Sequence, residues 1–339
     1  MVDAKIQLKL NPQVNIARST TARMWLLFTC AFVAVIQSAV SDYGASFAVA
    51  VAALVSAVLA ELLVTSTKHG LGKIKDGSTA ASALVLTLLL PNTIHPVYAA
   101  LGAAFAIVVV KYSFGGLGSN WLNPALGGWL FIRFSWPLSF SHALDGAVEK
   151  IPQLSSTVDN AVRTFLNHFV FSFLRAELPS GYVDLFMMKS PGIIADRAVL
   201  VLIFAVVVIA ACEVSRLWLS VIYLVVFGFL VRMIGDLPSG GAWWNGDVIY
   251  ALLSGGTLVT AFILIADPSS GAKSTPGNVI MVLLAALLSV AFRVFASSFY
   301  GGFFAIALIN ALTPIMCRVE RRLLYSVSPK GAYLPGGGS

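Results

Sequence analysis

The sequence has little charge for its length. Only 11% of its 339 residues are charged, whereas an ordinary soluble domain has about 25%. Hydrophobic residues make up 58% of the chain. Apolar stretches that could serve as membrane spans run from end to end, which leaves no room for a sizeable soluble domain. These features exclude an ordinary soluble enzyme and indicate that the bilayer is the solvent.

Cysteine is scarce as well. Cys30, Cys212 and Cys317 lie far apart with no CxxC spacing, so the sequence predicts no disulfide framework and no local iron–sulfur or zinc motif. We interpret the three as packing residues. No nucleophile–base pair or metal-ligand cluster is visible either. We therefore expect no catalytic residue, no metal site and no catalysis by the chain alone.

The net charge of +7 would suggest nucleic acid as a partner of a soluble protein. Here the basic residues collect in short loops of one side, so we interpret them as topology signals and expect lipid, not nucleic acid. Residues 1–23 contain four basic residues and no A-x-A-like cleavage site, which favours a cytoplasmic arm. The chain is predicted to lie in a bacterial inner membrane, with both termini on the cytoplasmic side. The basic loop residues are Lys68, Lys73, Lys75, Lys111, Arg216, Lys273, Arg318, Arg321, Arg322 and Lys330.

The fold class predicted is an all-α polytopic membrane protein with about ten transmembrane helices. The helices fall into two repeats of five, at 24–137 and 196–325. Between them, 138–195 is predicted to be an extracytoplasmic loop, and loops of this length are more often functional than incidental. The tail, 326–339, is linker-like and carries no argument. The predicted spans are 24–41, 45–65, 78–90, 97–112, 123–137, 197–212, 218–234, 248–266, 278–296 and 301–316.

An internal repeat relates the two groups of five. Phe114-Gly115-Gly116, followed by Asn123, recurs as Tyr300-Gly301-Gly302, followed by Asn310. Paired interruptions of this kind are typical of duplicated membrane folds whose broken helices meet near the midplane. The alternative is that Gly and Pro are simply common in membrane helices.

Two polar motifs interrupt the apolar pattern. Asp76-Gly-Ser78-Thr79 precedes a span short enough to be a half-helix, whose free N–H groups could hold an anion or a polar ligand edge. An ordinary helix cap is the alternative. The segment from Gly115 and Gly116 to Asn120 and Asn123 combines glycines, two amides and Pro124. Their polar groups must be satisfied inside the protein, so this segment should line something polar.

These motifs, with Ser254-Gly-Gly-Thr257 and the run ending Ala266-Asp-Pro268, resemble the RnfD/NqrB family. That family contains the D subunit of Rnf complexes and the B subunit of sodium-pumping NADH:quinone reductases. The resemblance covers about residues 20 to 325, and the short N-terminal arm is more similar to the Rnf member of the pair. It implies a urea-transporter-like fold with broken half-helices.

The resemblance also implies a cofactor. Members typically carry FMN, joined through its phosphate to a threonine in a motif like Ser-Gly-Ala-Thr-Pro-Leu. This sequence departs from the motif, because Ser180-Gly181 is followed by Tyr-Val. The candidate attachment residues are Thr164, preferred for its spacing, and Thr157. The alternatives are a noncovalent flavin, riboflavin, or no flavin. Residues expected near a flavin are Asp76, Ser78, Thr79, Gly115, Gly116, Asn120, Asn123, Ser254 and Thr257.

The function implied by the resemblance is electron transfer within an ion-translocating oxidoreductase of the ferredoxin:NAD type. Its partners would be other membrane subunits and flavoprotein or iron–sulfur subunits of the complex. The alternatives are a channel or transporter for a small polar solute, and a membrane anchor without flavin. Glu61, Asp76 and Asp267 are candidates for a Na⁺ or H⁺ path. Four further charges are expected to snorkel from span ends on the outer side: Arg133, Arg232, Asp247 and Arg293.

Overall fold

The computed structural model describes twelve stretches of the chain, and every structural statement below concerns these residues. They are 20–68, 76–113, 116, 120, 122–140, 157–168, 183, 192–211, 217–235, 243–267, 274–296 and 299–327. Within them the chain is helical, and the only β-pairing is an isolated antiparallel bridge between Pro91 and Ile193. The predicted all-α class is confirmed in the described part of the chain.

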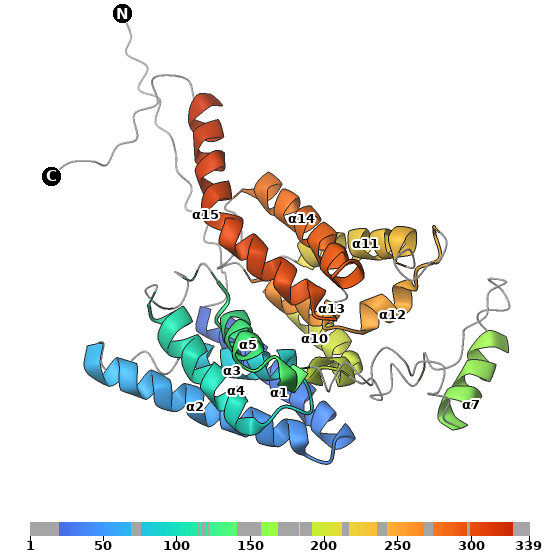
Figure 1. Ribbon diagram of the computed structural model, residues 1–339, viewed down its shortest axis with the longest axis horizontal. Coiled ribbons are helices and arrows are strands. Elements are labelled where there is room, and N and C mark those ends of the chain that lie inside the picture. The colour runs from blue at the N-terminus through green and yellow to red at the C-terminus, as the bar shows by residue number, and fades with distance from the viewer. Residues whose placement is uncertain are drawn as a thin grey trace, which may run out of the picture.

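Two groups of helices lie side by side, one coloured blue to green and the other yellow to red in Figure 1. The first consists of α1 (Thr20–Ser41), α2 (Ala45–Lys68), α3 (Ser78–Leu89), α4 (Pro96–Phe105), its π-helical continuation η2 (Ala106–Lys111) and α5 (Pro124–Ser135). The second consists of α10 (Val199–Ala211), α11 (Leu217–Ile234), α12 (Val248–Leu253), α13 (Thr257–Val259), its π-helical continuation η7 (Thr260–Leu264), α14 (Thr275–Val294) and α15 (Gly301–Val327).

Each of the ten predicted segments contains helix. Five helices are long and apolar enough to cross a membrane, namely α1, α2, α11, α14 and the first 19 residues of α15. The other segments are shorter or interrupted. In particular, the predicted span 248–266 is broken at Ser254–Gly256, between α12 and α13. The helical interruptions therefore fall at the motif that the sequence marks as polar.

Several helices begin at a capping side chain followed by proline. His95 accepts a hydrogen bond from Val97 N before α4, and Asn123 accepts one from Ala125 N before α5, each with a proline directly after the cap. Ser274 caps α14 in a similar way, through Gly277 N. A polar cap satisfies an N–H group that has no partner inside the helix, and proline fits the first turn because it lacks that N–H. These starts are therefore encoded locally.

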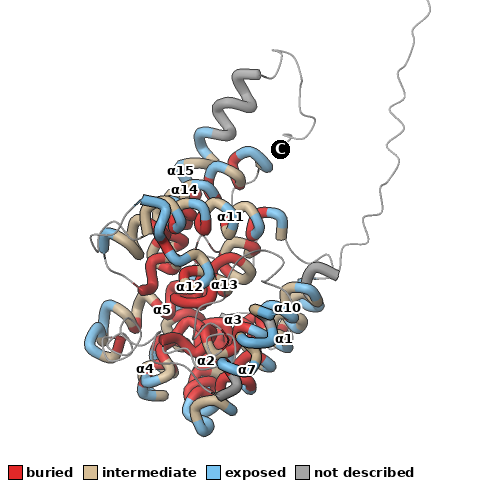
Figure 2. Tube along the Cα trace, turned by 90° about the vertical axis from the view of Figure 1, so that its right-hand side faces the viewer, coloured by how far each residue is buried: buried red, intermediate tan, exposed pale blue. Residues whose placement is uncertain are grey.

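Large apolar side chains cover the outer surface of both groups. Figure 2 shows buried residues running through the interior and exposed ones on the outward faces of the helices. In water such a surface would be unusual, but against lipid it leaves no polar group unsatisfied. The surface therefore suits a bilayer. Examples on five different helices are Val40, Leu63, Phe134, Phe204 and Val225.

An aromatic cluster joins the two groups. The Trp129 ring of α5 is fully buried, and its centroid lies 5.1 Å from the rings of both Phe303 and Phe304 on α15. Tyr300 adds a contact at 5.7 Å. Edge-to-face aromatic packing of this kind contributes beyond its buried area. The two groups thus share one core.

One helix stands apart from both groups. This helix, α7 (Thr157–Leu166), lies at the far right of Figure 1, within the region predicted as an extracytoplasmic loop. It is tied to the chain around Val183, whose N–H donates to the buried Asp159 carboxylate at 3.1 Å. The sequence did not predict this helix. Most of the loop, the first 19 residues of the arm and the end of the tail lie outside the described residues.

Candidate functional site

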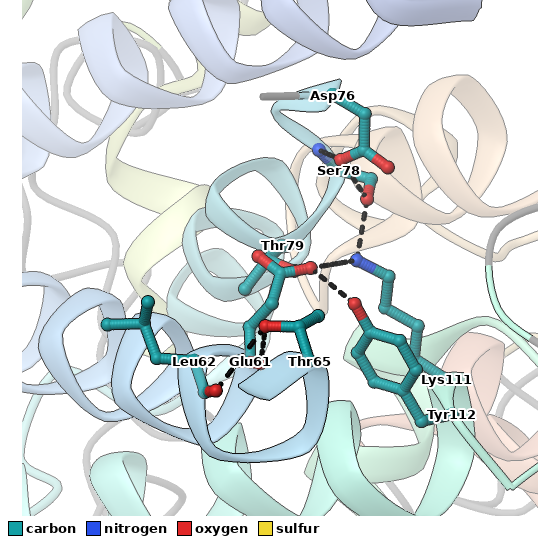
Figure 3. Close-up of polar contacts among 8 residues, drawn as sticks. All are labelled: Glu61, Leu62, Thr65, Asp76, Ser78, Thr79, Lys111 and Tyr112. Carbon is teal, nitrogen blue, oxygen red and sulfur yellow. Dashed lines mark hydrogen bonds and ion pairs between the residues drawn. The ribbon is translucent and has the colours of Figure 1, made fainter. Parts of the chain in front are cut away.

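A buried ammonium group lies where α2, α3 and the end of η2 meet. Lys111 is 2% exposed, and its Nζ donates to Glu61 Oε1 at 2.9 Å, Ser78 Oγ at 2.7 Å and Thr79 Oγ1 at 2.6 Å (Figure 3). An ammonium has three protons to donate, so all of them are satisfied here. We call this set of residues, with Tyr112 and Asp76, the Lys111 cluster.

Glu61 is as deeply buried as its partner. It is 2% exposed, and Oε1 accepts a second hydrogen bond from the Tyr112 hydroxyl at 2.8 Å. Removal of one member of a buried ion pair leaves the other charge unpaired, at a cost of about 3–5 kcal/mol. The sequence indicated Glu61 as an ion-path candidate but did not identify Lys111 as its partner. The expectation that Lys111 belongs to a basic loop is wrong, because Lys111 is the last residue of η2 and is buried.

The start of α3 supplies the hydroxyl groups of the cluster. Gly77 precedes the helix with φ of 72°, and a Cβ there would lie 2.9 Å from the Trp25 ring. The Asp76 carboxylate accepts from both Ser78 N at 2.9 Å and Ser78 Oγ at 2.7 Å. Because Ser78 donates its proton to Asp76, its lone pair faces Lys111. The cluster therefore connects one ammonium to Glu61 directly and to Asp76 through Ser78.

The polar segment after η2 holds the backbone of Lys111. The Asn120 amide nitrogen, in the orientation that satisfies the group, donates to the Lys111 and Gly116 carbonyls at 3.1 Å each. Gly116 has φ of 93°, and its own N–H donates to the Lys111 carbonyl at 3.0 Å. Asn120 is 4% exposed, in agreement with the prediction that it faces the protein interior. Gly115 lies outside the described residues.

A second cation occupies the corresponding place in the other group. The Arg293 guanidinium, near the end of α14, donates to the Ala251 and Ser254 carbonyls at 2.8 and 3.2 Å. It also donates to Thr257 Oγ1 at 3.1 Å and to Ser254 Oγ. These contacts bridge the break between α12 and α13. We call Arg293 and the residues that it contacts there the Arg293 cluster. The expectation that Arg293 snorkels outward is wrong, because its donors are satisfied by the broken helix.

The carboxylate of this cluster is Asp196, in the 3-10 turn η5 (Ile194–Arg197) before α10. Its two oxygens accept from Gly255 N at 2.8 Å and Gly256 N at 2.9 Å, at the start of α13. Burial raises the pKa of Asp196 to about 7, although these two N–H groups and the charge of Arg293 act in the opposite direction. Asp196 was not among the residues predicted from the sequence. The only local signal is a charged Asp-Arg pair directly before an apolar run.

Besides the two clusters, a polar contact links the two groups of helices. Asn123 Nδ2 donates to Asp267 Oδ2 at 2.7 Å, across 144 positions of the chain. Asp267 also lines a cavity of about 40 Å³ with Asn278 and Asn310, which is room for a water molecule. Ser254 and Thr257 are 1% and 3% exposed and Asn123 is partly exposed, so these predicted residues line the interior.

The two candidate attachment threonines lie at opposite ends of α7. Thr157 is its first residue, and Thr164 is exposed, with Oγ1 donating to the Asn160 carbonyl at 2.7 Å. The remaining charges expected at span ends make local contacts. Arg133 and Arg232 each donate to a backbone carbonyl, and Asp247 caps α12 through Tyr250 N. These three agree with a structural role.

Comparison with known proteins identifies the class. The NQR2, RnfD, RnfE family matches residues 7–325, so the chain belongs to this family. One relative is the D subunit of the proton-translocating ferredoxin:NAD(+) oxidoreductase complex of Clostridium ljungdahlii. The two chains are 23% identical, over 92% of this chain and 96% of that protein.

Two further relatives represent both branches of the family. The D subunit of the Na(+)-translocating ferredoxin:NAD(+) oxidoreductase complex of Acetobacterium woodii is 26% identical, over 81% of each chain. The B subunit of the Na(+)-translocating NADH-quinone reductase of Chromohalobacter salexigens is 27% identical, over 74% of this chain and 61% of that protein. The predicted family is confirmed.

Proposed function

We propose that the chain is a membrane subunit of an ion-translocating electron-transfer complex that couples ferredoxin and NAD chemistry to Na⁺ or H⁺ movement. The observation that carries this proposal is the family match over residues 7–325, together with relatives named as subunits of such complexes. Its partners are then the other membrane, flavoprotein and iron–sulfur subunits. The chain contributes position and charge, and bound cofactors supply the redox chemistry.

The proposed architecture is ten spans in two inverted repeats in a bacterial inner membrane, with both termini cytoplasmic. Three features support it: ten helical segments, one-sided basic loops, and two clusters in which a cation near the end of one helix contacts the start of a shorter one. A cysteine introduced at Lys73 tests the orientation. It should resist an impermeant thiol reagent added outside whole cells, and modification there would reverse the topology.

We propose further that FMN is attached through its phosphate to a threonine of α7, with Thr164 ahead of Thr157. The Thr164 hydroxyl fits, because it is exposed and its one described hydrogen bond, to Asn160, is a local helical contact that is inexpensive to lose. When bound, the flavin would carry electrons. Thr157 is ranked second because its motif spacing is less similar. It stays a candidate because a phosphate is favoured at the start of a helix and disfavoured near its end.

Matched valine variants separate these candidates. Valine removes the nucleophilic oxygen and keeps the volume, so Thr164→Val should assemble normally and lose the fluorescent flavin band from a denaturing gel. Thr157→Val is the control and should keep the band. The opposite pattern would assign the flavin to Thr157, and a wild-type protein without any band would exclude covalent attachment. Visible absorbance of the native protein then distinguishes noncovalent flavin from none.

The proposed ion path includes Glu61 and Asp76 on the cytoplasmic side, and Asp267. The charge balance of the Lys111 cluster supports it, since one ammonium contacts the Glu61 carboxylate directly and the Asp76 carboxylate only through the Ser78 hydroxyl. In proteoliposomes of the whole complex, Glu61→Gln should keep electron transfer and reduce ion uptake several-fold. Equal loss of both activities would instead indicate a structural role. A passive solute channel on the same fold is less well supported, because the chain's own cations occupy both polar clusters.

A further inference from the structure

The oxygen atoms around Lys111 form a cage that does not belong to its own helix. Glu61 comes from α2, and Ser78 and Thr79 come from the start of α3 (Figure 3). A buried lysine needs an acceptor for each proton, but nothing requires those acceptors to converge from two other helices. Three side-chain oxygens at 2.6 to 2.9 Å from one point could also supply part of the coordination shell of a monovalent cation.

The charges of the cage favour a cation even without the lysine. Glu61 and Asp76 carry two negative charges, and Asp76 orients the Ser78 hydroxyl so that its lone pair faces Nζ. Tyr112 donates to Glu61 but brings no positive charge. If Nζ withdrew, the buried carboxylate would be left without a counter-charge, which is strongly unfavourable. A free cation at the same point would restore the balance.

The chemistry and position of Lys111 would also allow its ammonium to leave the cage. Its ammonium ends a flexible four-carbon stem, and lysine, unlike arginine, binds as a point charge without a fixed fork. It is the last residue of a π-helical turn, a local irregularity that often occurs at functional sites. No backbone carbonyl accepts from Nζ among the described contacts. In these contacts the ammonium therefore donates only to side-chain oxygens, which could equally coordinate a free ion.

We propose that Glu61, Ser78 and Thr79 form a binding site for an inorganic monovalent cation, and that Lys111 is its tethered, exchangeable occupant. Within the proposed function, on which this second step rests, the coupling cation reaches Glu61 only when the ammonium withdraws. Lys111 is then a gate that prevents the ion from crossing without electron transfer.

Cation-specific stabilisation of Lys111→Ala tests the site without reference to electron transfer. The protein, purified with the subunits that accompany it, is unfolded thermally in NaCl, KCl or choline chloride at equal ionic strength. Lys111→Ala should melt about 2–4 °C higher in Na⁺ or K⁺ than in choline, with saturation. Wild type should show no difference between the salts. Lys111→Met is the matched control, because its side chain removes the charge and still fills the cage.

Two further results decide the interpretation. The double variant Lys111→Ala, Glu61→Gln should lose the salt difference, because the site has lost its carboxylate. If Lys111→Ala assembles only in Na⁺ or K⁺, the site is equally supported. The same melting temperature in all three salts, or failure to assemble in any of them, would overturn the proposal.

Ion uptake then separates the site from the proposed function. Proteoliposomes of the Lys111→Ala complex should transfer electrons and lose at least half of the ion uptake per electron. Normal coupling in a variant with cation-specific stabilisation would mean that the site exists but does not gate the path. A wild-type complex that moves no ion would refute the proposed function and leave the binding result untouched.

Discussion

The Lys111 and Arg293 clusters resemble each other in position and differ in what they hold. In both, a cation near the end of one helix contacts hydroxyl groups at the start of a shorter helix. Lys111 contacts side-chain oxygens only, including a carboxylate. Arg293 contacts two backbone carbonyls and two hydroxyls, and Asp196 caps the helix start separately.

This difference separates a replaceable cation from a structural one. The carbonyls of Ala251 and Ser254 lie where α12 ends, and in a membrane they have no water to bond. The Thr257 hydroxyl contacts both of them as well. A side chain with several donors in a fixed geometry reaches the two carbonyls and the two hydroxyls together, which is the property of arginine. We therefore interpret the Arg293 cluster as the clamp of a broken helix, and the Lys111 cluster as the chemically active counterpart.

The largest effect is expected from Glu61→Ala. It leaves the Lys111 ammonium buried without its counter-charge, so we expect a loss of about 3–5 kcal/mol of stability. Thermal unfolding and recovery of assembled protein measure it. Glu61→Gln also removes the counter-charge but keeps an oxygen that can accept from Nζ, so it should lose somewhat less. A Glu61→Gln protein as stable as wild type would mean that the charge of Glu61 does not matter for folding.

Arg293→Lys should also have a large effect. The ammonium cannot reach both carbonyls and both hydroxyls, so buried acceptors lose their partners and stability should fall by about 2–3 kcal/mol. Arg232→Lys is the control, since Arg232 is exposed and donates to a single described carbonyl, that of Gly246. Its melting temperature should stay close to wild type. If Arg293→Lys behaves like the control, the clamp interpretation is wrong.

Gly256→Ala tests the start of α13 itself. Gly256 has φ of 67°, and an added Cβ would lie 2.4 Å from the Phe303 ring and 2.7 Å from Ile193. Strain and overpacking should together cost about 2–4 kcal/mol. Gly44→Ala shares the positive φ but has nothing within 4 Å, so only the strain of about 1–2 kcal/mol should remain. A comparison of the two melting temperatures isolates the packing contribution.

The most gradual expected effect is the pH dependence contributed by Asp196. Its pKa is raised to about 7 by burial, so the folded state binds a proton that the unfolded state has released. Its contribution to stability is complete below about pH 4 and is lost as the pH rises toward 7, by at most about 1.4 kcal/mol per pH unit. Wild type should therefore lose stability between about pH 5 and 7, and Asp196→Asn should lose less. Parallel curves for the two proteins would contradict this.

Sequence reasoning locates the polar interruptions but not the contacts made there. Hydropathy and polar motifs are local, which is why the helical segments and the burial of Asn120, Ser254 and Thr257 could be predicted. The Lys111–Glu61 pair joins positions 50 residues apart, and no local pattern encodes such a pairing. The apolar sequence neighbours of Arg293 favour a position at the end of a span. No residue near it in the sequence indicates that carbonyls at the end of α12 contact its guanidinium.

The helix α7 is a local element that was not predicted from the sequence. Its ten residues are less apolar than a span, so a search for spans passes over them. Val158, Val162 and Phe165 nevertheless have the i, i+4, i+7 spacing of an amphipathic helix. Its position matters for the flavin, because one threonine candidate starts the helix and the other lies near its end. The gel assay of the valine variants therefore also tests whether the helix dipole or the motif spacing governs attachment.

Anomalous scattering from crystals soaked with thallium(I) tests the central distinction most directly. In the Lys111→Ala protein, we expect a thallium peak within coordination distance of Glu61, Ser78 and Thr79. In the Arg293→Ala protein, the same soak should leave the Ser254 and Thr257 region without a peak. No peak in the first protein, or peaks of equal height in both, would contradict the assignment of one cluster as a cation site and the other as a clamp.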